Sequence, residues 1–223
     1  MKQGVLVVAA GRGQRMGSET PKQFLELKGK PLLVHSLERF RDFDPGIRMV
    51  VVLGNGMEPF WEPVLKAHPW LHEVTLATGG TERSNSVRNG LAVMSGVEVV
   101  GIHDAVRPLV SRDTLERTYA HAAQHGSAIP AVDMEDSVRR LTGRGSEAVD
   151  RSTLKRIQTP QVFQLHRIRE AYDFVGEQVF TDDAAVYEAC YGSVDLVKGN
   201  RENLKITTPA DLRLAEALLD LGH

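Results

Sequence analysis

A glycine-rich segment with two cationic side chains lies near the start of the chain. Residues 9–17 are Ala-Ala-Gly-Arg-Gly-Gln-Arg-Met-Gly, and Lys22 follows within Pro-Lys-Gln. Small residues let a backbone approach a ligand closely, and successive amide N–H groups can bind an anion. Arg15 and Lys22 add positive charge beside these amides. The segment therefore predicts a phosphate-binding loop, with a surface loop carrying two solvated cations as the alternative interpretation.

Two familiar phosphate-binding motifs do not match this segment. A Walker A loop ends in Gly-Lys-Ser/Thr, whereas Gly17 is followed by Ser18 and Glu19. A dinucleotide fingerprint requires a third glycine at position 16, which is methionine, and an acid near the end of the second strand. Residues 53–55 are Leu-Gly-Asn and supply no acid. The spacing thus argues against an ordinary NTPase and against a nicotinamide enzyme.

Two further groups of residues suit substrate recognition. Gly79 and Gly80 predict a turn near the start of a helix. This turn either contacts a ligand or is an ordinary connection between elements. Asp104 ends an apolar run and Arg107 follows three residues later. This acid can accept hydrogen bonds from a ligand or attract a cation, unless it pairs with Arg107 only to shape the loop. We expect His103 to be a packed, hydrogen-bonded histidine rather than a metal ligand.

Composition narrows the possible partners and the compartment. The 223 residues carry 27 Lys and Arg against 29 Asp and Glu, so no general basic field favours nucleic acid or an anionic membrane. The apolar run at residues 5–10 is far shorter than the roughly 20 residues of a membrane span. The single cysteine, Cys190, excludes an intrachain disulfide and fits a reducing compartment. We therefore expect a cytoplasmic protein without a secretion signal.

Alternating strands and helices are predicted to position these residues. Continuous apolar runs are typical of strands buried on both faces, and helical periodicity lies between them. The expected strands are residues 4–8, 49–53, 72–78 and 97–102, and the expected helices are 32–40 with Pro31 at the first helical position, 85–94, 113–124 and 210–221. This order favours a doubly wound, mostly parallel α/β sheet, which binds ligands beyond the carboxyl ends of its strands.

A polar segment at about 133–158 interrupts this alternation. Val138 and Leu141 precede a glycine pair at 143 and 145, and Val149 follows, which predicts an extended β-hairpin with a glycine turn. Such a hairpin buries little surface by itself and is expected to pack on another subunit. We therefore expect one domain over residues 1–223 with a projecting dimerisation arm.

Several motifs occur in one order along the chain. The loop at 9–17 with Pro-Lys-Gln resembles the signature loop of sugar-phosphate nucleotidylyltransferases. Further motifs are Gly-Gly-Thr-Glu-Arg at 79–83 with Ser86-Val87, His-Asp-Ala-Val-Arg-Pro at 103–108, Thr-Pro-Gln at 159–161, and Asn-Leu-Lys-Ile-Thr at 203–207. Together, over essentially the whole chain, they resemble the 2-C-methyl-D-erythritol 4-phosphate cytidylyltransferases of the non-mevalonate isoprenoid pathway.

This resemblance implies a fold, a reaction and a role for particular residues. The fold would be the Rossmann-like nucleotidyltransferase sheet, and the reaction would transfer CMP from CTP to a polyol phosphate. Arg15 and Lys22 would stabilise the transition state, while Lys205 and Arg151 would hold the attacking phosphate. The residues expected around the substrates are Ala9, Ala10, Gly11, Gly80, Thr81 and Ser86 for the nucleotide, and Asp104, Ala105, Arg107, Ser137 and Thr159 for the rest of the site.

The resemblance also implies a metal and an assembly. Mg²⁺ or another divalent cation would be held mainly by triphosphate oxygens, with Asp104 as a candidate protein ligand. Ser137 and Arg151 would reach the active site of the partner subunit in a homodimer that exchanges its arms.

Two other functions remain open at this point. A cytidylyltransferase for another polyol phosphate, such as ribitol 5-phosphate, would use the same nucleotide site. A noncatalytic nucleotide sensor is a different class of protein, but binding alone would not require cations directed at both phosphates.

Overall fold

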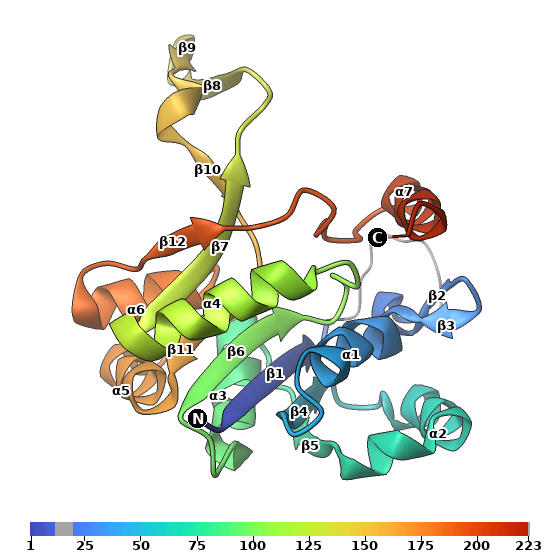
Figure 1. Cartoon of the computed structure of the whole chain (residues 1–223). Helices are drawn as coiled ribbons and strands as arrows, with labels where there is room; N and C mark the ends of the chain where they lie inside the picture. The colour runs from blue at the N-terminus through green and yellow to red at the C-terminus, as the bar shows by residue number, and fades with distance from the viewer. Residues whose placement is uncertain (12–19, 223) are drawn as a thin grey trace.

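The apolar runs of the sequence form the centre of a mixed sheet. The structure is a computed structural model that describes residues 1–11 and 20–222. Within these residues eight strands pair in the order β10-β7-β11-β6-β1-β4-β5, and β12 pairs with β7 (Figure 1). The strands are β1 (Gln3–Ala9), β4 (Arg48–Leu53), β5 (Thr75–Thr78), β6 (Val99–Asp104), β7 (Ser127–Asp133), β10 (Lys155–Ile157), β11 (Gln161–Gln164) and β12 (Leu196–Lys198).

The four strands β6, β1, β4 and β5 are parallel to one another. β11 runs antiparallel to both β6 and β7, and β10 runs antiparallel to β7, whereas β12 is parallel to β7. The carboxyl ends of β1, β4, β5 and β6 therefore meet at one edge of the sheet. The predicted, mostly parallel sheet is confirmed, with antiparallel strands added on one side.

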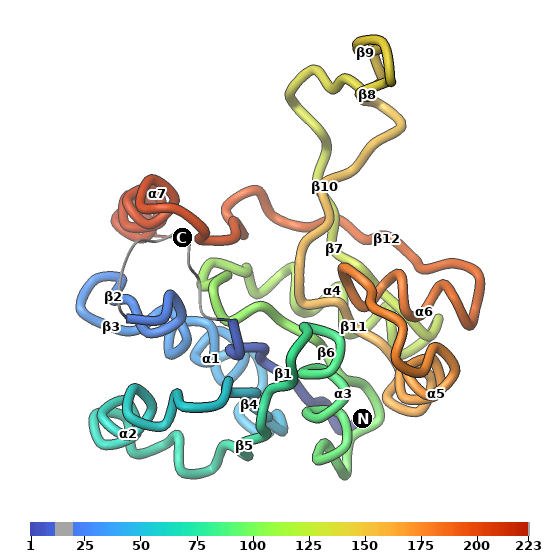
Figure 2. The backbone as a smooth tube through the Cα atoms, turned by 180° about the vertical axis from the view of Figure 1, so that it is seen from behind, coloured from blue at the N-terminus to red at the C-terminus, as the bar shows by residue number. Residues whose placement is uncertain are grey.

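Helices cover both faces of the sheet because side chains alternate along its strands. Val5 and Val7 of β1 pack in one apolar cluster, and Leu6 between them packs in another. The first face carries α1 (Leu32–Phe43), α2 (Glu58–Ala67) and α4 (Arg112–His125), and the second carries α3 (Arg83–Val93), α5 (Leu165–Val175) and α6 (Asp183–Tyr191). Figure 2 shows the molecule from behind, with the helices of the second face toward the viewer. The predicted double winding is thus confirmed.

Some elements differ from the sequence prediction. Pro31 is the N-cap of α1 rather than its first helical residue, because its backbone is extended, with φ −56° and ψ 142°. The first part of the expected strand at 72–78 belongs to a 3₁₀ turn, η3 (Pro69–Glu73), and only its end pairs as β5. The helices α2, α5 and α6 and the strands β7, β10, β11 and β12 were not predicted. By contrast, α7 (Pro209–Asp220) begins within one residue of the expected range 210–221, with Thr208 and Asp211 capping each other's backbone N–H groups.

Close packing around two glycines fixes the loop that follows β5. The Gly79 N–H donates to the Leu53 carbonyl at 2.7 Å, and a Cβ atom on Gly79 would lie only 2.6 Å from the Cβ of Ala10. A Cβ atom on Gly90, within α3, would lie 2.2 Å from a methyl carbon of Leu6. Glycine at both positions therefore lets α3 and its preceding loop approach the end of β1.

The polar segment forms the expected hairpin. β8 (Val138–Thr142) and β9 (Gly145–Val149) pair antiparallel across a glycine turn, and the hairpin projects away from the sheet (Figure 1). Its side chains are mostly exposed, and Leu141 is 85% exposed. The short η4 turn (Arg151–Thr153) follows β9 and leads into β10.

A small cluster beside the sheet joins the C-terminal helix to the loop after β6. α7 packs there with a short hairpin formed by β2 (Glu26–Leu27) and β3 (Lys30–Pro31). The shared apolar side chains are Leu27, Leu32, Val106, Leu109, Ile206 and Ala215. Among the described residues, no helix is long and apolar enough to cross a membrane.

Candidate active site

A pocket opens at the carboxyl edge of the parallel strands, between the ends of β1 and β6 and the start of α3. Most of the residues predicted from the sequence line it, namely Ala9, Ala10, Gly11, Lys22, Gly80, Thr81, Ser86, Asp104, Ala105 and Lys205. Val8, Gln23, Glu82, Arg83 and Val106 also line it and were not predicted as site residues. Segments from both ends of the chain therefore meet here, at the strand edge where open α/β sheets bind ligands.

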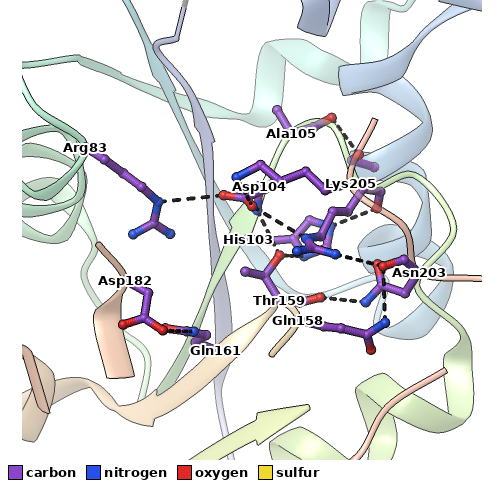
Figure 3. Close-up of polar contacts among 12 residues, drawn as sticks. Arg83, His103, Asp104, Ala105, Gln158, Thr159, Gln161, Asp182, Asn203 and Lys205 are labelled. Carbon is purple, nitrogen blue, oxygen red and sulfur yellow. Dashed lines mark hydrogen bonds and ion pairs between the residues drawn. The ribbon is translucent and has the colours of Figure 1, made fainter. Parts of the chain in front are cut away.

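Asp104 lies at the centre of a cluster of three cations. Lys205 Nζ lies 2.9 Å from Asp104 Oδ2, and Arg83 Nε lies 3.7 Å from Oδ1 (Figure 3). Arg107 Nε lies 3.5 Å from Asp104 Oδ2. Burial tends to raise the pKa of Asp104, but the charges of Arg83, Lys205 and Arg107 outweigh it and hold the pKa well below its usual value. Asp104 is therefore a carboxylate that orients cations toward the pocket.

Arg83 links this cluster to a second buried carboxylate. Its Nη2 lies 2.8 Å from Oδ2 of Asp183, a residue with no exposed surface at the start of α6. The Tyr172 hydroxyl donates to the other oxygen of Asp183 at 2.7 Å. Burial acts to lower the pKa of Arg83, but Asp183 and Asp104 raise it well above its usual value. Arg83 is thus a permanently charged group held between two carboxylates.

The first residue of β11 holds Asp183 in place. Gln161 Oε1 accepts hydrogen bonds from the backbone N–H groups of Asp183 and Ala184, at 2.9 and 2.8 Å. Gln161 Nε2 donates to Asp182, whose side chain caps α6. Gln161 belongs to the Thr-Pro-Gln motif that the sequence singled out, and its role here is to orient the start of α6.

His103 and Thr159 form the floor beneath Asp104. Burial lowers the pKa of His103 to about 4, so its ring is neutral near pH 7. Its Nε2 lies 3.0 Å from the Arg107 carbonyl, which can only accept, so this nitrogen carries the proton. His103 Nδ1 therefore accepts from the Thr159 hydroxyl at 3.0 Å, and that oxygen accepts from the Asp104 N–H at 3.1 Å. His103 is the packed histidine that the sequence predicts, and Thr159 lies under the pocket rather than among its lining residues.

Arg107 and Lys205 are positioned by the segment that precedes α7. Arg107 Nη1 donates to the Asn203 carbonyl at 2.8 Å, and the Asn203 amide donates to the Thr159 carbonyl at 2.8 Å. The Ile206 N–H donates to the Val106 carbonyl at 2.9 Å, which fixes the backbone beside Lys205. Lys205 keeps 40% of its side chain exposed, so it is accessible to an anion from solvent.

Backbone groups and short side chains shape the other side of the pocket. Ser86 Oγ accepts from the Gly80 N–H at 3.0 Å and donates to the Glu82 carbonyl at 3.1 Å. The Thr81 hydroxyl donates to Asn85 at 3.3 Å, and Asn85 also caps the start of α3. Ser86 therefore holds the loop in a defined shape at the point where the family resemblance implies a nucleotide.

The segment after the glycine-rich loop brings Lys22 to the pocket. Lys22 opens the η2 turn (Lys22–Phe24), and Gln23 beside it donates to the Ala9 carbonyl at 2.6 Å. Gln23 is buried, so this bond ties η2 to the end of β1. Lys22 is thereby placed against the pocket, whereas Arg15 lies outside the described residues.

Two predicted residues lie on the arm and not at this pocket. Ser137 and Arg151 are exposed, and the Arg151 guanidinium donates to the Glu135 carbonyl within the arm. Among the described residues, neither lines the pocket of its own chain.

The pocket suits a divalent ion that is carried mainly by another molecule's oxygens. Each oxygen of Asp104 already faces at least one cation, and Glu82 is the only other carboxylate among the described lining residues. A hard ion such as Mg²⁺ requires about six oxygen ligands, which polyphosphate and water supply better than this pair. The residues fit a polyphosphate-bound ion with Asp104 nearby.

Comparisons with known proteins agree over the whole length of the chain. The family model described as IspD, 2-C-methyl-D-erythritol 4-phosphate cytidylyltransferase, matches residues 4–221. A Bacteroides thetaiotaomicron protein with the same description is 47% identical over 219 residues, covering 98% of this chain and 100% of that protein.

Solved structures show the same similarity. That of a 2-C-methyl-D-erythritol 4-phosphate cytidylyltransferase from Thermus thermophilus has a TM-score of 0.82 at 34% identity, covering 99% of this chain and 100% of the other. That of a 4-diphosphocytidyl-2C-methyl-D-erythritol synthase from Anaerococcus prevotii has a TM-score of 0.83 at 26% identity, covering 98% and 96%.

Proposed function

The chain belongs to the 2-C-methyl-D-erythritol 4-phosphate cytidylyltransferase family, and we propose that it transfers CMP from CTP to 2-C-methyl-D-erythritol 4-phosphate. The products are 4-diphosphocytidyl-2-C-methyl-D-erythritol and pyrophosphate. An oxygen of the acceptor phosphate forms a bond to the α-phosphorus of CTP, and the bond between the α-phosphorus and the bridging oxygen breaks. The electron pair of that bond leaves with pyrophosphate.

This reaction needs positive charge and positioning more than it needs a base. A phosphate monoester has a second pKa near 6, so it attacks as a dianion and loses no proton. The one histidine at the pocket floor fits this requirement, because the ring nitrogens of His103 are already engaged by Thr159 and the Arg107 carbonyl. The observation that carries the proposal is the convergence of Lys205, Arg107 and Arg83 on Asp104 beside the loop after β1.

Individual roles follow from these positions and from the family. Lys22 and Arg15 stabilise charge at the transferring phosphorus, and Lys205 holds the attacking phosphate together with Arg151 of a second subunit. Asp104 and Arg107 contact the polyol. The segments at 9–11 and 80–86 surround the nucleotide. Mg²⁺ or another divalent ion, when bound to the triphosphate, neutralises part of its charge.

The arm is proposed to complete the active site of a second subunit. Arg151 lies on η4 at the base of the hairpin, exposed and outside its own pocket, and the hairpin exposes Leu141 at its outer end. A partner that covers this hairpin would bury both. We accordingly propose a single nucleotidyltransferase domain, a homodimer with exchanged arms, and a cytoplasmic location.

A panel of acceptors tests the proposed reaction. Pyrophosphate release is measured with CTP and Mg²⁺ in the presence of 2-C-methyl-D-erythritol 4-phosphate, of ribitol 5-phosphate, or of neither. Release that depends on the first acceptor supports the proposal. Pyrophosphate release only with ribitol 5-phosphate would instead identify that compound as the acceptor, a result that the family assignment does not favour. Tight CTP binding without release from either acceptor would instead indicate a nucleotide sensor.

Subunit mixing tests the exchanged arm. In a heterodimer of Lys22→Ala and Arg151→Ala subunits, one site would contain both intact components. An equal mixture after subunit exchange should therefore recover about one quarter of wild-type activity, since half of the dimers would be mixed and one of their two sites complete. Lys22→Ala mixed with Lys205→Ala is the control, because both changes lie in the body of a subunit and no site is complete. Equal activities in the two mixtures would contradict exchange.

A further inference from the structure

Two histidines and an aspartate come together at the end of α4 that lies away from the active site. His121 and His125 are one helical turn apart, and their rings stack with centroids 4.3 Å apart. His121 Nε2 lies 2.8 Å from Oδ2 of Asp195, in the link between α6 and β12. One ligand atom from each residue lies within 4.8 Å of the others. α4 begins beyond the carboxyl end of β6, so its last turn lies at the opposite edge of the sheet.

The backbone holds Asp195 firmly against this helix. Its N–H donates to Ser127 Oγ at 3.2 Å, and its carbonyl accepts from the Ile129 N–H at 2.8 Å. Both partners belong to β7, a strand whose N-terminal part is buried. The position of the carboxylate is therefore set by the sheet, while His121 and His125 belong to a helix that packs on the same strand.

The donor set has the chemistry of a borderline transition-metal site. Histidines four residues apart on one helical face form the ligand pair of known helical zinc motifs, and a carboxylate commonly supplies the third ligand. Tetrahedral Zn²⁺ places its donor atoms about 3.3 Å apart for bonds of about 2.0 Å. His125 and Asp195 are exposed, so small side-chain rotations bring the three donors to that spacing and leave a position for water. The partial negative charge at a helix C-terminus further favours a cation.

We propose that His121, His125 and Asp195 form a surface binding site for a divalent ion of the zinc class. The ion would join the last turn of α4 to the link before β12. Hydrogen bonds also connect α4 to β12 itself, because Arg117, one turn earlier on the same helix, donates to the carbonyl of Lys198, the last residue of β12, at 3.0 Å. Near the N-terminal end of α4, the Thr114 hydroxyl donates to the side chain of Asn200, which follows β12, at 3.2 Å. The ion would therefore stabilise the folded chain and leave the chemistry of the active site unchanged.

Calorimetric titration of the full-length protein with ZnCl₂, in the absence of nucleotide, tests this site. We expect one high-affinity ion per chain, an affinity at least tenfold lower for His125→Ala and for Asp195→Asn, and no change for His72→Ala, an exposed histidine outside the cluster. Mg²⁺ at millimolar concentration should not compete, because hard ions prefer oxygen ligands. Zinc should also raise the melting temperature of the wild type and not that of His125→Ala.

His125→Ala is the decisive variant, because it leaves the contact between His121 and Asp195 intact. Wild-type affinity in this variant would show that zinc binds without His125 and would overturn the proposal, as would the absence of zinc binding to the wild type. Since His125 is exposed on the last turn of its helix, the variant is expected to fold, which its circular dichroism and turnover with CTP verify.

Discussion

Asp183 is the residue whose replacement most directly tests the buried charge network. Its carboxylate is inaccessible to solvent and accepts hydrogen bonds from Arg83 at 2.8 Å and from Tyr172 at 2.7 Å. Removing one partner of a buried ion pair costs about 3–5 kcal/mol, because the remaining charge stays buried without compensation. Asparagine keeps the size of the side chain and one acceptor oxygen. We therefore expect Asp183→Asn to lower the free energy of unfolding by about 3 kcal/mol.

The same change should affect catalysis through Arg83. In the variant, the one carboxylate partner that the described part of the chain leaves to the guanidinium is Asp104. The guanidinium is drawn toward it, which displaces a group that lines the pocket. Misplacement by about 1 Å can reduce a rate on the order of 100-fold. We expect kcat/KM for CTP to fall by about 10- to 100-fold. Denaturant titration measures the first effect, and pyrophosphate release below the melting temperature measures the second.

Two control variants separate positioning from stability. Tyr172→Phe removes only the hydroxyl group and should cost about 1 kcal/mol while leaving kcat/KM near that of the wild type. Asp173→Asn, on the exposed surface of α5, should change stability by less than about 0.5 kcal/mol. If Tyr172→Phe and Asp183→Asn lost activity in proportion to their loss of stability, the network would be structural only. Wild-type kcat/KM in Asp183→Asn would refute the role of Arg83.

Three further changes probe other parts of the site. Lys22→Ala should lower kcat by at least about 100-fold. Lys66→Ala, at an exposed position of α2, is the control and should leave kcat unchanged. Turnover of Lys22→Ala within a few-fold of wild type would refute the assignment. Because burial lowers the pKa of His103 from 6.5 to about 4, the unfolded chain binds a proton between these values that the folded chain does not. The contribution of His103 to the free energy of unfolding is thus complete above pH 6.5 and falls by about 3 kcal/mol toward pH 4. Denaturant titrations over this pH range should show a smaller fall in the free energy of unfolding for His103→Gln than for the wild type. A Cβ on Gly79 would lie 2.6 Å from that of Ala10, so Gly79→Ala should lower the free energy of unfolding by about 1–3 kcal/mol and weaken CTP binding. Denaturation and CTP titration measure the two effects. Gly143→Ala is the control, because a Cβ at Gly143 would meet open space.

The sequence was most informative where a strand ends at the site. The apolar runs that became β1, β4 and β6 are long and buried on both faces, so their carboxyl ends could be located within one or two residues. Residues at or shortly after these ends, such as Asp104 at the end of β6 and Gly11 after β1, were therefore predicted as site residues from local pattern together with the family resemblance. Lys205 was placed by the resemblance alone, because no periodicity relates it to β6.

The rest of the network depends on contacts between distant segments. Arg83 meets Asp183 across 100 residues, and hydrophobic periodicity contains no information about such a pair. A local signal did exist, since the Asp-Asp doublet at 182–183 followed by two alanines has the pattern of a helix start. α2 was missed because Pro59 and Pro63 interrupt its helical pattern, and β12 because three residues give no alternation.

The carboxylates of this site orient its cations rather than cancel their charge. Among the described residues, Arg83, Arg107 and Lys205 pair with Asp104 and Asp183, so three cations meet two carboxylates in this cluster and a net positive charge remains. Without these carboxylates, the two partly buried arginines would carry an uncompensated desolvation cost. With these carboxylates, two partners fix each guanidinium group. Arg83 is held by Asp104 and Asp183. Arg107 is held by Asp104 and the Asn203 carbonyl. A reaction between two polyanions requires charge that is both positive and immobile, and a buried acid among cations provides the second property without removing the first.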